Sequence, residues 1–120
     1  LSNAIMKTYE KIIEDLRENK DLKIVEGKKD KEALEKLGVS KIITLKGPIS
    51  QFISRINERI IILVDCDERG EKITQEIINQ CEQHGLKYDL EFRKKICKVF
   101  GIKKFEEIYK KMEKLEGEYG

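Results

Sequence analysis

An unbroken apolar run, Ile-Ile-Ile-Leu-Val, occupies residues 60–64 of a chain in which 40% of the residues are charged. A strand with one face in water alternates apolar and polar residues, whereas a strand covered on both faces needs no polar positions. The run therefore predicts the central strand of a parallel sheet that has helices on both faces. A length of 120 residues is that of one domain.

Shorter strands and helices alternate on either side of this run. Apolar residues recur at helical spacing between short segments that are rich in Val, Ile and Leu. Parallel neighbours in a sheet must be joined by crossover elements, so this order predicts an α/β fold with a four-stranded parallel sheet. The expected strands are 22–25, 41–45, 60–64 and 87–90, and the expected helices are 5–21, 30–37, 49–56, 73–84 and most of 91–120.

The chain divides into a core and two helical additions. Residues 1–4 resemble the remnant of a cleaved expression tag. Residues 5–21 are expected to form an N-terminal helix, 22–90 the core of the domain, and 91–120 a C-terminal helical extension. Within the core, Asp30 is expected to cap the second helix, because its carboxylate can accept a free backbone N–H.

Composition excludes several classes of protein. Twenty-five Lys and Arg residues against twenty-three Asp and Glu residues give a net charge of +2, too balanced to indicate nucleic-acid binding by charge alone. No apolar stretch approaches the roughly 20 residues that cross a bilayer, and no signal peptide opens the chain, so we expect a cytoplasmic protein without membrane association. Cys66, Cys81 and Cys97 show no CxxC spacing, and we expect them to stay reduced, with no disulfide.

Three acidic residues follow two of the expected strands. Asp65 and Asp67 come directly after the central strand, and if the backbone stays extended both side chains leave the same face of the sheet. Glu26 follows the first strand and reaches the same edge if the two strands are neighbours. Closely spaced carboxylates repel one another unless a pKa rises or a divalent cation joins them. Oxygen ligands without His or Cys favour magnesium, with manganese as a second possibility.

The same residues resemble the two motifs of the Toprim domain family. Ile-Val-Glu-Gly-Lys-Lys-Asp at 24–30, followed by Ala33 and Leu34, is similar to the glutamate motif, and Leu-Val-Asp-Cys-Asp-Glu-Arg-Gly at 63–70 is similar to the DxDxxG motif. The resemblance spans residues 22–90. It is strongest to small, free-standing archaeal and bacterial members, whose closest enzymatic relatives are nucleases that mature ribosomal RNA.

The resemblance implies a magnesium-dependent protein that processes RNA or DNA, with phosphodiester cleavage as the expected reaction. It implies that Glu26 is the general acid/base or a metal ligand and that Asp65 and Asp67 hold magnesium. Gly27 and Gly70 would let the backbone approach phosphate closely. Four cations beside the acids are further candidates for gripping phosphates, although such residues more often only face solvent: Lys28, Lys29, Arg69 and Lys72.

Other interpretations remain open. The domain can instead be a non-catalytic module that binds nucleic acid or a protein partner through the same edge, and the terminal helices can pack on the sheet or on a second copy of the chain. An EF-hand calcium loop beginning at Asp65 is disfavoured, because Arg69 occupies a ligand position and a strand precedes the loop where an EF-hand has a helix.

Overall fold

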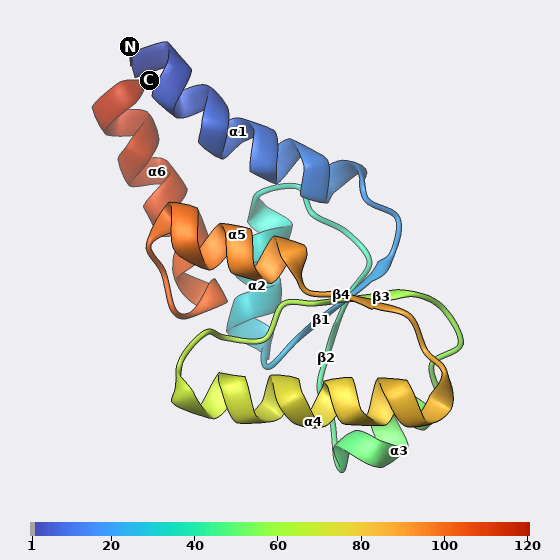
Figure 1. Cartoon of the computed structure of the whole chain (residues 1–120). Helices are drawn as coiled ribbons and strands as arrows, with labels where there is room; N and C mark the ends of the chain where they lie inside the picture. Colours follow the sequence, from blue (N-terminus) through green and yellow to red (C-terminus); the bar gives the residue numbers. More distant parts are fainter. Residues whose placement is uncertain (1) are drawn as a thin grey trace.

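Helices and strands alternate along the chain (Figure 1). The computed structural model describes residues 2–120. Among these residues, no helix is both long enough and apolar enough to span a membrane. The elements, in chain order, are α1 (Ser2–Glu18), β1 (Leu22–Val25), α2 (Lys28–Lys36), β2 (Ile42–Thr44), α3 (Ile49–Ser54), β3 (Ile60–Ile62), α4 (Glu68–His84), β4 (Tyr88–Asp89), α5 (Glu91–Phe100), the 3₁₀ turn η1 (Phe105–Glu107) and α6 (Ile108–Tyr119).

The four strands form one parallel sheet in the order β2-β1-β3-β4, which confirms the predicted α/β fold. Ile24 of β1 pairs with Ile43 of β2 on one side and with Ile62 of β3 on the other. All three residues of β3 are fully buried, as expected for a central strand. However, β3 ends at Ile62, so the last two residues of the apolar run lie beyond the sheet ladder.

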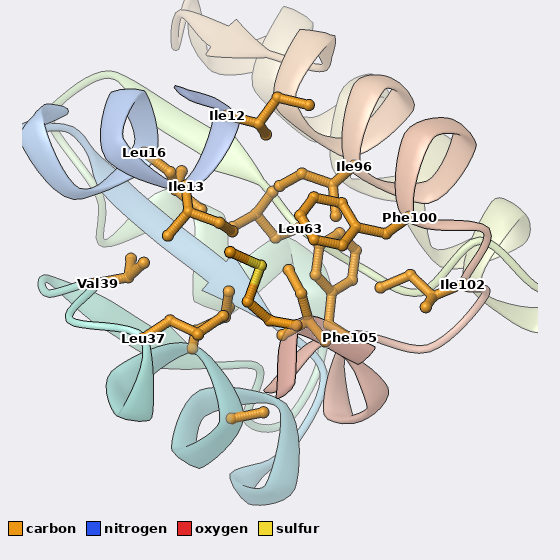
Figure 2. Close-up of a cluster of buried hydrophobic side chains, with 14 of the residues drawn as sticks. Ile12, Ile13, Leu16, Leu37, Val39, Leu63, Ile96, Phe100, Ile102 and Phe105 are labelled. Carbon is orange, nitrogen blue, oxygen red and sulfur yellow. The ribbon is translucent and has the colours of Figure 1, made fainter. Parts of the chain in front are cut away.

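Helices cover both faces of the sheet (Figure 1). On one face, α3 and α4 pack over a cluster that includes Ile24, Ile62 and Ile77. On the other face, α1, α2, α5, η1 and α6 enclose a larger cluster. Figure 2 shows Leu63, which follows β3, lying among Ile96 of α5 and Phe105 of η1 in this second cluster.

The first and last helices pack together on the second face. α1 contacts both α5 and α6, and Tyr9 meets Phe100 edge to face with ring centroids 5.0 Å apart. α1 begins at Ser2 and ends at Glu18, earlier at both ends than expected. α4 ends as expected, since His84 is its last residue and Gly85 follows in the left-handed conformation with φ 66°.

The expectation of three reduced cysteines is wrong. Cys66, in the turn after β3, and Cys97, in α5, form a disulfide with their Cα atoms 6.7 Å apart, and Cys81 is free and buried. An odd number of cysteines does not exclude a single bond. The partners lie 31 residues apart in sequence and meet only because α5 packs beside the end of β3.

Candidate metal centre

Glu26 and Asp65 meet at the carboxyl edge of the sheet. β1 and β3 are paired neighbours up to Ile24 and Ile62, so the residues that follow them emerge side by side. They line one hollow of about 350 Å³, where ligands of parallel sheets usually bind. Its lining residues are Glu26, Gly27, Lys28, Lys29, Asp30, Asp65, Arg69, Lys104 and Glu106.

Glu26 is nearly buried and only partly satisfied. Its side chain is 15% exposed, and Oε2 lies 3.9 Å from Nη1 of Arg69. Its Oε1 is buried and has no hydrogen-bond partner. Burial is the main cause that raises the pKa of Glu26, and the charge of Asp65 raises it further, while Arg69 opposes the shift. An anionic Glu26 is therefore short of a compensating charge.

Asp65 is more deeply buried than Asp67. Its Oδ1 accepts the backbone N–H of Phe105 at 2.9 Å. The pKa of Asp65 is raised to about 6, mainly by burial and further by the neighbouring carboxylates of Asp30, Asp67 and Glu106, while the hydrogen bond from Phe105 lowers it. The carboxylates of Glu26, Asp65 and Asp67 are thus close enough to repel one another, as the sequence predicted.

Asp67 takes a different orientation. The strand ends at Ile62 and the chain bends at Cys66 and Asp67, so the two aspartates do not lie on one continuous strand. The Asp67 side chain caps α4 by accepting the N–H of Gly70 at 2.7 Å. It lines a neighbouring hollow of about 460 Å³ together with Glu68, Arg69 and Lys72. Arg69 borders both hollows.

The two motif glycines have different surroundings. A Cβ on Gly70 would lie 1.9 Å from the carbonyl oxygen of Asp65, so only glycine lets α4 pack against this turn. A Cβ on Gly27 would meet its nearest neighbour, Oδ2 of Asp30, at 3.8 Å. Asp30 lies in the first turn of α2, and Gly27 occupies the N-cap position before it. From the first turn, the Asp30 carboxylate accepts the Gly27 N–H at 3.0 Å. The predicted N-cap position of Asp30 is therefore wrong.

Two residues of the hollow, Lys104 and Glu106, come from the segment at η1. Neither residue belongs to the motifs at 24–30 and 63–70. The structure places them beside Glu26 and Asp65 because η1 packs against α2. No local pattern could have indicated this, since the contact joins residues about 40 to 80 positions apart.

A family comparison covers the segment that carries these acids. The model of the Toprim domain matches residues 21–100, two thirds of the chain. The chain belongs to the Toprim family. Toprim domains are associated with metal-dependent processing of nucleic acids. The match contains Glu26, Asp65 and Asp67 and stops before η1 and α6, so Lys104 and Glu106 lie outside the matched region.

Similar proteins occur in archaea, and a similar structure has been solved from Aquifex aeolicus. The chain is 34% identical over 109 residues to a UPF0292 protein of Pyrococcus horikoshii, covering 86% of this chain and 83% of that protein. It is 40% identical over 93 residues to a UPF0292 protein of Pyrococcus furiosus, covering 73% and 70%. A solved structure of a protein from Aquifex aeolicus superposes with a TM-score of 0.73 at 30% identity, covering 82% of this chain and 95% of that one.

The donor set of this Toprim centre fits a hard divalent cation. Within residues 2–120, no three His, Cys, Asp or Glu side chains converge tightly enough to enclose an ion by themselves. Magnesium nevertheless needs only one or two carboxylates, because it keeps several waters and takes phosphate oxygens as further ligands. Glu26 and Asp65 line the same hollow and would supply such a pair, and the buried Oε1 of Glu26 has no hydrogen-bond partner.

Proposed function

We propose that this protein binds magnesium, or manganese, at the Toprim centre and cleaves phosphodiester bonds in RNA or DNA. One observation carries the proposal: Glu26 and Asp65, both at Toprim motif positions, share one hollow in which a buried carboxylate oxygen lacks a partner. Burial and repulsion raise the pKa of both carboxyls, and a divalent cation would compensate for this charge.

Asp65 and Asp67 would hold the ion, and Glu26 would complete the set or act as the general acid/base. A bound divalent ion would polarise the phosphate and stabilise the leaving oxygen. Glu26 lies beside Asp65 with a free Oε1, so it can accept a proton from the attacking group and return it to the leaving group. Asp67 would have to give up its hydrogen bond with the N–H of Gly70 to join the set.

Cations beside the hollow are suited to hold the substrate. Lys28, Lys29 and Arg69 border the acidic hollow, and Lys72 borders the adjoining one with Arg69. Their side chains would offset charge on the phosphate oxygens. These roles stay predictions.

Removing both aspartate charges tests the proposal. Asp65→Asn combined with Asp67→Asn is expected to abolish magnesium-dependent cleavage while the circular dichroism spectrum stays that of the folded protein. The assay incubates structured RNA, single-stranded DNA and double-stranded DNA with the protein in magnesium, and products are resolved on gels. A matched control is Glu35→Gln combined with Glu76→Gln, which removes two exposed acids and should cleave like wild type. Equal cleavage by the two double variants would contradict the assignment.

A second candidate function is a non-catalytic module that binds nucleic acid or a protein partner through the same edge. It is favoured by the position of Asp67, whose carboxylate is used to cap α4. Binding in a gel-shift assay without any product in the cleavage assay would support this module. Calorimetry separates the two further: magnesium or manganese binding that is lost in Glu26→Gln combined with Asp67→Asn supports the metal centre.

A further inference from the structure

Arg93, in the first half of α5, is buried against the turn that carries the aspartates. It is 5% exposed. Its Nε donates to the carbonyl oxygen of Val64 at 2.6 Å, and its Nη2 donates to that of Asp65 at 2.7 Å. Nη2 also pairs with Oε1 of Glu71 at 2.7 Å. Neither Toprim motif includes Arg93.

Burying a guanidinium is costly unless its donors find acceptors, so the position of Arg93 needs a compensating set of contacts. The turn supplies them. The ladder between β1 and β3 ends with the Leu63 N–H, which donates to Ile24 at 2.8 Å. The next two carbonyls, of Val64 and Asp65, both face Arg93. Consecutive carbonyls of an extended strand point in opposite directions, so Arg93 stabilises a backbone that has turned out of the sheet.

The segment after Arg93 holds the same turn at further points. The Cys66 N–H donates to the carbonyl of Lys103 at 2.6 Å, and the Phe105 N–H donates to the Asp65 carboxylate at 2.9 Å. Leu63 packs with Ile96 and Phe105 in the cluster drawn in Figure 2. We call the contacts made by Arg93, Lys103 and Phe105 with residues 64–66 the C-terminal clamp.

We propose that Arg93 is a positioning residue of the metal centre, which fixes the backbone at Val64 and Asp65 so that the Asp65 carboxylate faces Glu26. The inference rests on the proposed metal-binding function. It goes beyond the motif acids, because it makes a residue 28 positions downstream necessary for the affinity of the site. Glu71 supports the role by balancing the charge of Arg93.

A purely structural role predicts different results. If Arg93 only stabilised the fold, its replacement would lower the free energy of unfolding but leave the ion affinity of the folded molecules unchanged. If it positions Asp65, the folded variant binds the ion more weakly. Residues that orient metal ligands typically change affinity by about 10- to 100-fold when they are mutated.

The decisive variant is Arg93→Lys, which keeps the charge but cannot donate to two carbonyls from a planar fork. We expect Mn²⁺ affinity, measured by calorimetry at a temperature where circular dichroism shows full folding, to fall about 10- to 100-fold. Arg93→Met is the second variant and should bind at least as weakly. The control is Lys23→Met, which replaces the other buried cation of the described residues, in β1, and should keep wild-type affinity. Wild-type affinity in folded Arg93→Lys would overturn the inference.

Amide hydrogen exchange gives a readout that needs no metal. Arg93→Lys is expected to lose protection at the N–H groups of Cys66 and Phe105 while Ile61 in β3 keeps it. Unchanged protection at Cys66 and Phe105 would refute the positioning role even if wild type binds Mn²⁺. Conversely, if wild type binds no Mn²⁺, the proposed metal-binding function fails, and the exchange data still decide whether Arg93 orders the turn.

Discussion

The two strand-to-helix turns that carry the acidic residues differ in what holds them. The β1–α2 turn consists of Glu26 and Gly27, and the Gly27 N–H donates a local hydrogen bond to the Asp30 carboxylate. The β3–α4 turn, residues 63–67, is held by Arg93, Lys103, Phe105 and the disulfide to Cys97. In the first turn, Oε1 of Glu26 has no hydrogen-bond partner. In the second turn, the Asp65 carboxylate is held by the N–H of Phe105, which is distant in sequence. This difference agrees with the roles proposed above, of an acid/base for Glu26 and a metal ligand for Asp65.

Among the changes that test this difference between the turns, breaking the disulfide is expected to lower the free energy of unfolding most. Replacing both Cys66 and Cys97 by Ser should lower the free energy of unfolding by about 3 to 4 kcal/mol, because a cross-link over a loop of this length restricts the unfolded chain. Urea unfolding of the oxidised proteins measures it. Dithiothreitol should lower the stability of wild type to a similar extent.

The double serine variant is itself the control for the reductant, since it has no disulfide to lose. Exchange protection should fall in the β3–α4 turn and stay unchanged at Gly27 in the β1–α2 turn. A wild-type protein that dithiothreitol does not destabilise would show that the bond contributes nothing to holding the turn.

The glycines offer the next largest effect. Gly70→Ala places a methyl group 1.9 Å from the Asp65 carbonyl oxygen, so α4 or the turn must shift, and we expect a loss of about 2 to 3 kcal/mol together with weaker Mn²⁺ binding. Gly27→Ala is the matched variant in the other turn. Gly27 has φ −144°, which alanine adopts freely, so its loss should stay below about 1 kcal/mol. Chemical unfolding of both variants checks the difference, and equal losses would contradict the contrast between the turns.

Local patterns were sufficient to predict the architecture. The run at 60–64 indicated a buried central strand, and β3 is the fully buried strand between β1 and β4. Helical spacing located every helix of the core approximately. The reason is physical, because the pattern of apolar residues along a short segment shows whether a strand or helix is buried on one face or on both. The ends of helices and strands depend less on neighbouring residues in sequence. The apolar run therefore continues to residue 64, although β3 ends at Ile62.

The site was predictable only where it depends on the strand ends. Glu26 and Asp65 reach one hollow because β1 and β3 are neighbours. The use of Asp67 as a helix cap, the disulfide of Cys66 and the contacts of Arg93 were missed. Each depends on how the backbone turns after Ile62, and that turn is set by α5 and η1, whose packing no short motif encodes.

The smallest expected effect concerns Asp30, whose carboxylate holds the β1–α2 turn. Burial raises the pKa of Asp30 above the ordinary value of 3.8, against the opposing hydrogen bond from Gly27. The folded protein therefore holds this proton more tightly than the unfolded chain does. Linkage then gives the sign: the stabilisation by protonated Asp30 is complete below pH 3.8 and is lost as the pH rises through the raised pKa of the folded state.

Asp30→Asn removes this titration while keeping an oxygen that accepts the Gly27 N–H. In a chelator, the variant should be more stable than wild type at neutral pH, and the difference should disappear below pH 3.8. Urea unfolding at both pH values measures it, with Glu35→Gln on the same helix as the control for loss of one exposed charge. A gain that is equal at both pH values would mean that the amide improves the packing of the turn. A gain confined to neutral pH would show that the β1–α2 turn carries an electrostatic cost beside Glu26.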